Sequence, residues 1–307
     1  MRVLKAFLWI ALPLALLGAA LFMLLDFGES PEETLPPIVQ AEPEPTVTEP
    51  EPTPPPIPSP EPTPQPTEPP RANPFSEAPL LRHAAYAHYA IFCFRDEALY
   101  SGGDSPRMPA ASVIKVFIMY YAYAQIESGE LAADAIIGGQ RIHSLISLMI
   151  QRSDNAATNA LIDYFGMEAL NRFFLERGFS DTLLQRRMLD TAARSRGFDN
   201  YTSTGDVMAF LIRLYENRSH FPYDEMQDIM LGQEIRTKIH LFLPPGTPVA
   251  SKTGELPDVE NDMGLVFTEN GVFAIVVLTS GVRDNAAARQ AIGQLARDAY
   301  GYVMAGQ

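Results

Sequence analysis

A run rich in proline, glutamate and threonine extends from Pro31 to Pro74 and offers almost no apolar side chain for burial. This composition predicts an extended, disordered spacer rather than part of a packed core. In polyproline II geometry, which rises about 3.1 Å per residue, the run would reach roughly 140 Å. We therefore confine the folded part of the chain to residues 75–307. Much of the net charge of −14 comes from the glutamates of the spacer and says little about a folded surface.

The segment before the spacer indicates a membrane anchor. Residues 6–25 carry no charge, and about 20 apolar residues in a helix match the thickness of a bilayer. Arg2 and Lys5 precede this run, whereas Asp26 and Glu29 follow it. Because positive charge stays on the cytoplasmic side, we expect a cytoplasmic N-terminus and a single-pass anchor in the cell membrane, with the rest of the chain outside the cytoplasm.

A cleaved signal peptide is the alternative, because the small residues Gly18, Ala19 and Ala20 lie within the apolar run. The run continues beyond them to Leu25, which favours an uncleaved anchor. The predicted organisation is a cytoplasmic N-terminus at 1–5, a transmembrane anchor at 6–25, a disordered linker at 26–74 and a folded domain at 75–307.

Composition argues against several other classes of protein. No stripe of lysine and arginine indicates a nucleic-acid partner. Cys93 is the only cysteine, so the chain has no internal disulfide, and its apolar, strand-like surroundings predict a buried structural thiol. The histidines show no clustered spacing, so we expect neither a metal site nor a cofactor. Nothing in the sequence indicates the oligomeric state.

Strand-like and helical patterns occupy different parts of the folded region. Strand-like segments lie at both ends and helical segments fill the middle, which predicts one sheet assembled from distant parts of the chain with a helical lobe beside it. The expected strands are 84–95, a short partner near Leu99, 249–253, 262–268 and 272–278, the last two joined by a type I′ turn at Asn270-Gly271. The expected helices are 112–128, 141–151, 156–165, 167–177, 203–216, 223–243 and 285–304.

Three short motifs carry the chemistry: Ser112-Val113-Ile114-Lys115, Ser153-Asp154-Asn155 and Lys252-Thr253-Gly254. A serine hydroxyl needs a neighbouring base to become a nucleophile, and a lysine three residues later in a helix lies on the same face. Burial in the apolar helix 112–128 and a second cation from Lys252 should both lower the pKa of Lys115, so that its amine can accept a proton. The N-terminus of that helix would offer the Ser112 N–H to a developing oxyanion.

The ordered set resembles the motifs of class A β-lactamases and penicillin-binding proteins. The resemblance implies an α/β (α+β) fold, with a mixed αβα layer around a mainly antiparallel sheet and an all-α lobe. It also implies a role for each motif residue. Ser112 would be the nucleophile, Lys115 its base, Ser153 a proton relay to the leaving group, Asn155 a hydrogen-bond partner of the acyl side chain, Lys252 and Thr253 the site for a substrate carboxylate, Gly254 a point of close backbone approach, and the N–H of Glu255 a second oxyanion donor.

Two departures from the family pattern bear on turnover. The family's deacylating glutamate lies about 35 residues after the second motif, where residues 185–194 of this chain contain only one carboxylate, Asp190. Asp190 is either the deacylating group or a structural partner for Arg186, Arg187 or Arg194, and the sequence leaves both interpretations open. Glu255 also puts an acidic side chain beside the expected carboxylate site, where a like charge costs on the order of 1 kcal/mol.

We therefore expect a membrane-tethered, extracytoplasmic serine hydrolase that acts through an acyl-enzyme on a small-molecule β-lactam or a related cell-wall peptide amide. A D-Ala-D-Ala peptidase or transpeptidase is one alternative. The other is a penicillin-binding sensor module that is acylated without turnover, which would need a partner for signalling because only about five residues precede the span.

Overall fold

The computed structural model describes residues 72–102 and 106–306, which belong to one unit, Glu68–Gln307. The predicted N-terminus at 1–5, the anchor at 6–25 and nearly all of the linker at 26–74 lie outside the described residues. Within the described ranges, every helix is too short or too polar to cross a bilayer.

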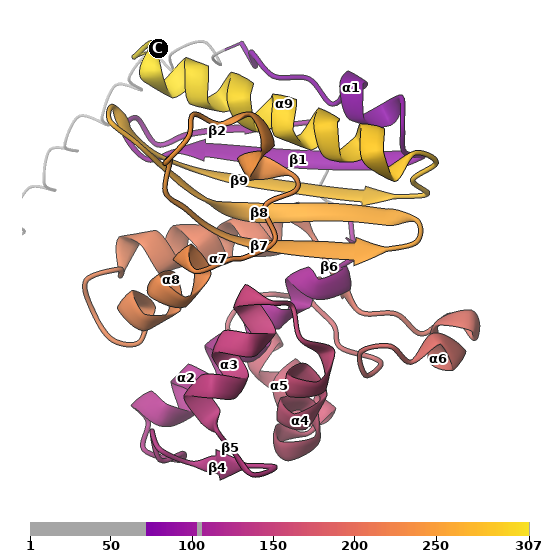
Figure 1. Cartoon of the computed structure of the whole chain (residues 1–307), viewed down its shortest axis with the longest axis vertical. Coiled ribbons are helices and arrows are strands. Elements are labelled where there is room, and N and C mark those ends of the chain that lie inside the picture. The colour runs from indigo at the N-terminus through magenta and orange to yellow at the C-terminus, as the bar shows by residue number, and fades with distance from the viewer. Residues whose placement is uncertain (1–71, 103–105, 307) are drawn as a thin grey trace, which may run out of the picture. The chain divides into compact units, whose positions relative to one another are not determined.

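A five-stranded antiparallel sheet forms the centre of the domain, in the order β2-β1-β9-β8-β7 (Figure 1). β1 pairs with β9 from Tyr86 opposite Ser280 to Cys93 opposite Phe273. The first strands and the last strands of the domain therefore complete one sheet, as the sequence predicts. The strands are β1 (Tyr86–Cys93), β2 (Ala98–Ser101), β7 (Val249–Leu256), β8 (Val259–Thr268) and β9 (Gly271–Ser280).

Helices cover both faces of this sheet (Figure 1). α9 (Asn285–Met304) lies on one face with the short α1 (Ala78–Leu81), and α7 (Thr204–Glu216) and α8 (Tyr223–Leu231) lie on the other. Alternate side chains of β1 divide between two cores: Ile91 and Cys93 pack in the cluster under α9, and Ala90 packs in the larger cluster on the opposite side. The single thiol is thus buried in a strand, as predicted.

The helical lobe is built around α2 (Lys115–Glu127), which follows the 3₁₀ turn Ala111–Ile114. From Lys115 to Tyr120 no side chain is more than 2% exposed, so this helix is buried on all faces of its first turns. Phe117 packs edge-on against Phe179 with ring centroids 4.9 Å apart. Around α2 lie α3 (Ile142–Gln151), α4 (Asn155–Phe165) and α5 (Met167–Glu176).

The helix predicted over 223–243 is wrong in its second half. α8 ends at Leu231, and only a 3₁₀ turn, Ile239–Phe242, follows. The fully buried amide of Gln233 accepts the Ile235 N–H at 2.9 Å and donates to the Ile150 carbonyl at 3.0 Å, so a side chain replaces the helical backbone partners there.

The hairpin between β8 and β9 is confirmed, but its turn lies one residue earlier than predicted. Thr268 pairs with Gly271, which puts Glu269 and Asn270 in the turn, and of the expected pair only Gly271 has a positive φ. Several short elements carried no periodic signal and were missed. They are α1, β3 (Met108–Pro109), β4 (Ile136–Ile137), β5 (Gln140–Arg141), α6 (Thr191–Ser195) and β6 (Tyr201–Thr202).

Candidate active site

Ser112 lies in the 3₁₀ turn that leads into α2. Ser112 is partly exposed, whereas Val113, Ile114 and Lys115 are buried. Because side chains three residues apart eclipse one another in a 3₁₀ turn, Ser112 and Lys115 project from the same side. The preceding residue, Ala111, has a φ of 48°, a conformation that is unfavourable for a residue other than glycine and that is common at functional sites. The turn therefore presents the serine hydroxyl at the surface with a buried amine beside it.

The Lys115 amine is held by the second motif. Its Nζ donates to the Ser153 carbonyl at 2.7 Å, to Ser153 Oγ at 3.2 Å and to Asn155 Oδ1 at 2.9 Å. Burial lowers the pKa of Lys115 from 10.5 to about 7, although the charge of Asp154 raises it. A neutral amine is therefore well populated near pH 7. The contacts of the described residues include no hydrogen bond between Lys115 Nζ and Ser112 Oγ, and such catalytic contacts are often long in a free enzyme.

Ser153 links the two lysines. Its Oγ lies 3.2 Å from Lys115 Nζ and 3.0 Å from Lys252 Nζ, and its backbone has a positive φ of 55°. Asp154 fixes this turn as the N-cap of α4, because its carboxylate accepts the Ala157 N–H at 2.7 Å. The hydroxyl is thus positioned to exchange protons with either amine.

Lys252 approaches from β7 and is fully buried. Besides Ser153, its amine contacts the Thr253 carbonyl at 2.8 Å. Burial, and after it the charge of Lys115, hold the pKa of Lys252 well below its usual value. Burial disfavours the charged form of both lysines, and the repulsion between the two ammonium groups disfavours charging both at once.

Gly254 brings β7 against the serine turn. A Cβ at this position would lie 2.9 Å from the Ala110 carbonyl oxygen, closer than Cβ atoms come to backbone, and a tight 3.1 Å from the Ser112 nitrogen. Only glycine permits this approach, as the resemblance implies. The N–H groups of Ser112 and of Glu255, the residue after the glycine, therefore stay our candidates for the oxyanion donors.

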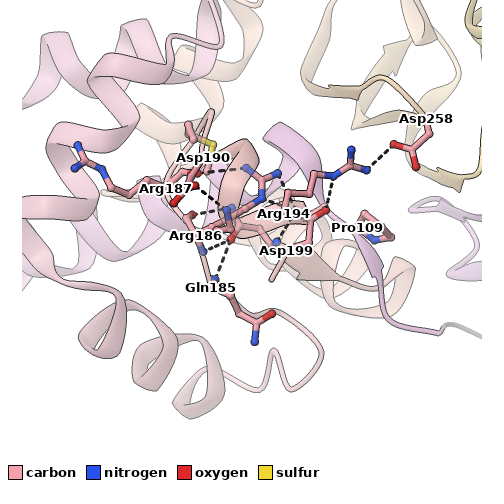
Figure 2. Close-up of polar contacts among 12 residues, drawn as sticks. Pro109, Gln185, Arg186, Arg187, Asp190, Arg194, Asp199 and Asp258 are labelled. Atoms are coloured by element: carbon pink, nitrogen blue, oxygen red, sulfur yellow. Dashed lines mark hydrogen bonds and ion pairs between the residues drawn. The ribbon is translucent and has the colours of Figure 1, made fainter. Parts of the chain in front are cut away.

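Asp190 has a structural contact that the sequence did not suggest. Its carboxylate accepts the Ala193 N–H at 2.8 Å and caps the five-residue helix α6. The side chains of the three arginines considered as partners bind other carboxylates, Arg186 and Arg194 at Asp199 (Figure 2) and Arg187 at Asp163, so none pairs with the Asp190 carboxylate. In the described residues Asp190 has no ion pair, and no hydrogen bond to Ser112, Lys115 or Ser153. The geometry favours the structural interpretation of Asp190.

Ion pairs and an amide fix the loop 185–200 that carries Asp190. Arg186 and Arg194 share Asp199, at 2.8 and 3.0 Å, and Arg194 also reaches Asp258 in the turn between β7 and β8 at 2.5 Å (Figure 2). Arg187 pairs with Asp163 of α4 at 2.8 Å. On the inner side, Asn159 bonds to both backbone groups of Met188, accepting at 2.8 Å and donating at 3.1 Å. Asn159 follows the second motif by one helical turn, and its role was not predicted from the sequence.

Two cations balance the negative charge of Glu255. Its carboxylate oxygens lie 2.9 Å from Lys238 Nζ and 3.4 Å from Arg289. Partial burial would raise the pKa of Glu255, but the charge and hydrogen bond of Lys238, together with Arg289, outweigh burial and lower it. The expected electrostatic cost therefore needs revision: Glu255 is charged, and cations already neutralise it.

A cavity of about 660 Å³ adjoins this site, between the loop 185–200 and the end of β7. The residues that line it include Leu189, Tyr201, Glu255 and Leu256. Among residues 72–102 and 106–306, no group of three or more His, Cys, Asp or Glu side chains is placed to hold a metal ion.

Comparison with known proteins gives consistent results. The model of a family described as the β-lactamase enzyme family matches residues 93–303. A β-lactamase from Sphaerobacter thermophilus is 25% identical, with a TM-score of 0.66 over 74% of this chain and 96% of that one. PBP-A is 24% identical (TM-score 0.65, 72% and 90% of the two chains), and the extended-spectrum β-lactamase TLA-3 is 18% identical (TM-score 0.67, 73% and 95%). No curated protein matches the sequence.

The pKa of Lys115 predicts the pH dependence of acylation. The amine is neutral above its pKa of about 7, so the acylation rate should rise through pH 7, level off above it and be about tenfold lower one pH unit below the pKa. The measurement is the rate of covalent labelling by a penicillin between pH 5.5 and 9. Lys115→Ala should lose about a hundredfold in rate together with the step at pH 7. A wild-type rate that is flat or falls across pH 7 would contradict the role of Lys115.

Two substitutions separate the interpretations of Asp190. Asparagine caps helices as well as aspartate does, whereas alanine costs about 1 kcal/mol. If Asp190 is a cap, Asp190→Asn should keep wild-type stability and acyl-enzyme lifetime, and Asp190→Ala should lower the free energy of unfolding. Asp284→Ala removes the same kind of cap from α9 and is the matched control. A much longer acyl-enzyme lifetime in Asp190→Asn, measured by intact-protein mass spectrometry, would instead identify a deacylating carboxylate.

Proposed function

Because the chain belongs to the β-lactamase enzyme family, we propose that Ser112 is acylated by a β-lactam or a related cell-wall amide and later released by hydrolysis. The observation that carries this proposal is the relay of Lys115, Ser153 and Lys252, in which one hydroxyl lies within 3.2 Å of two buried amines. If Ser112 only capped a helix and Lys115 were a surface residue, the Lys115 amine would not be buried and would not share a hydroxyl with a second buried lysine.

The proposed acylation uses these groups in order. The neutral Lys115 amine takes the proton of Ser112, and the oxygen attacks the carbonyl carbon of the amide. The Ser112 and Glu255 N–H groups stabilise the negative oxygen of the tetrahedral intermediate. The carbon–nitrogen bond then breaks, and Ser153 passes a proton to the leaving nitrogen while its hydroxyl is replenished from the Lys115 side.

We propose that release of the acyl group is the slow step. Hydrolysis of the ester needs a base that activates water. Asp190 is the carboxylate that lies where the family has its deacylating glutamate, and it caps helix α6. Lys115, with a pKa of about 7, would then be the base that activates water. Slow release also fits a D-Ala-D-Ala peptidase or transpeptidase, whose acyl group passes to another acceptor.

We further propose that the domain acts outside the cytoplasm, held to the cell membrane by residues 6–25 through the spacer. The support is sequence alone: the charge-free run, the charges on either side of it and the proline-rich composition. A long spacer would let a membrane-held domain reach cell-wall amides at a distance from the bilayer.

A fluorescent penicillin tests the nucleophile and the slow step together. The wild-type chain should become labelled and lose the label more slowly than it gains it. Ser112→Ala should stay unlabelled, and Ser128→Ala, at the C-terminal end of α2, should label like the wild type. Equal labelling of Ser112→Ala would refute the nucleophile. Rapid release would identify an efficient β-lactamase, and complete retention of the label would identify a sensor.

Fractionation tests the tether. The full chain should stay in the membrane pellet after alkaline extraction, and protease added outside intact cells should remove the folded domain. A soluble product that begins just after Gly18, Ala19 and Ala20 would instead establish signal-peptide cleavage.

A further inference from the structure

Behind the strand of the third motif lies a group of buried charges. Lys238 and Glu260 are both fully buried, and their Nζ and Oε2 atoms lie 3.0 Å apart. Arg289 of α9 bonds to the other oxygen of Glu260 at 2.8 Å. Asp262, also fully buried, accepts the N–H groups of Ile239 and Met263 at 3.0 Å each. Charges buried in this way persist only when each has partners of opposite sign.

Glu255 completes this group from the side of the active site. It bridges the same two cations, with one oxygen 2.9 Å from Lys238 and the other 3.4 Å from Arg289. Its side chain is 40% exposed, whereas Lys238 and Glu260 are inaccessible. Arg289 is 34% exposed, and Glu255 is the member of the group that lines the adjoining cavity.

The position of Glu255 on β7 sets it beside the expected carboxylate site. Thr253 and Glu255 are two residues apart on one strand, so their side chains project from the same face. Thr253 is the residue that should receive a substrate carboxylate together with Lys252. A carboxylate of the protein thus lies next to the place where a carboxylate of the substrate would bind.

In the part of the chain that the structure describes, the cations around this place already have partners. Lys238 and Arg289 each contact both Glu255 and Glu260. Lys252 uses its amine on Ser153 and on the Thr253 carbonyl. An incoming carboxylate would find Lys238 and Arg289 already paired with carboxylates and would meet Glu255 beside them.

We propose that Glu255 is an internal occupant of the anion subsite: its carboxylate binds Lys238 and Arg289 in place of a substrate carboxylate. The site then selects acyl donors whose leaving group carries no negative charge, such as an ester or an amide, over those that end in a free carboxylate. This inference rests on the proposed function, because it concerns the leaving group of the reaction at Ser112.

Benzylpenicillin and its methyl ester test the inference, since they differ only in the charge on the leaving-group side. The measured quantity is the ratio of their acylation rates, acid over ester, from intact-protein mass spectrometry. Glu255→Gln leaves Lys238 and Arg289 with Glu260 as their one shared carboxylate, so the group gains a net positive charge. The ratio should then rise at least about tenfold, because the substrate carboxylate meets an attractive charge in place of a neutralised one. Glu255→Asp keeps the charge and should stay closer to the wild type.

Glu269→Gln is the matched control, because it removes the same charge from an exposed turn at the opposite end of β8. Its ratio should equal that of the wild type. If the wild type is labelled but Glu255→Gln changes the ratio no more than Glu269→Gln does, the inference is wrong and the proposed function stands. If neither compound labels the wild type, the proposed function fails, and the inference fails with it.

Discussion

The burial of two lysine amines around one serine hydroxyl is the constraint on which the site depends. Lys115 comes from the helical lobe and Lys252 from the sheet, and both reach Ser153. A charged amine removed from water is unfavourable unless it is paired, so burial shifts Lys115 toward its neutral form. The interaction that joins the two parts of the fold is thus the same one that produces a base near neutral pH.

Close packing of backbone against backbone keeps this arrangement. Gly254 of the third motif lets β7 lie against Ala110 and Ser112. Ala111 and Ser153 both have positive φ angles, which are unfavourable for residues other than glycine. Such strain persists only when surrounding contacts over-determine it. Here these contacts include the buried helix α2 and the N-cap of Asp154.

Periodicity and motifs predicted the parts of the molecule that depend on local sequence. The hydrophobic pattern of α2, the strands at both ends and the residues of the three motifs could all be identified before any geometry. The partners of Glu255 could not, because Lys238, just before the 3₁₀ turn at 239–242, and Arg289 of α9 reach it only through tertiary packing. The cap at Asp190 could not be predicted either, because a five-residue helix such as α6 has no periodic signal in the sequence.

The same tertiary charges explain why specificity would depend on Glu255 rather than on its neighbours. Removal of one partner from a fully buried ion pair leaves an uncompensated charge and typically costs 3 kcal/mol or more. Lys238 and Glu260 form such a pair, because both side chains are inaccessible to solvent and each compensates the charge of the other. Glu255 is partly exposed, so water can compensate for its loss. Substitution at this position can therefore change the charge that a substrate meets while the buried pair behind the strand stays intact.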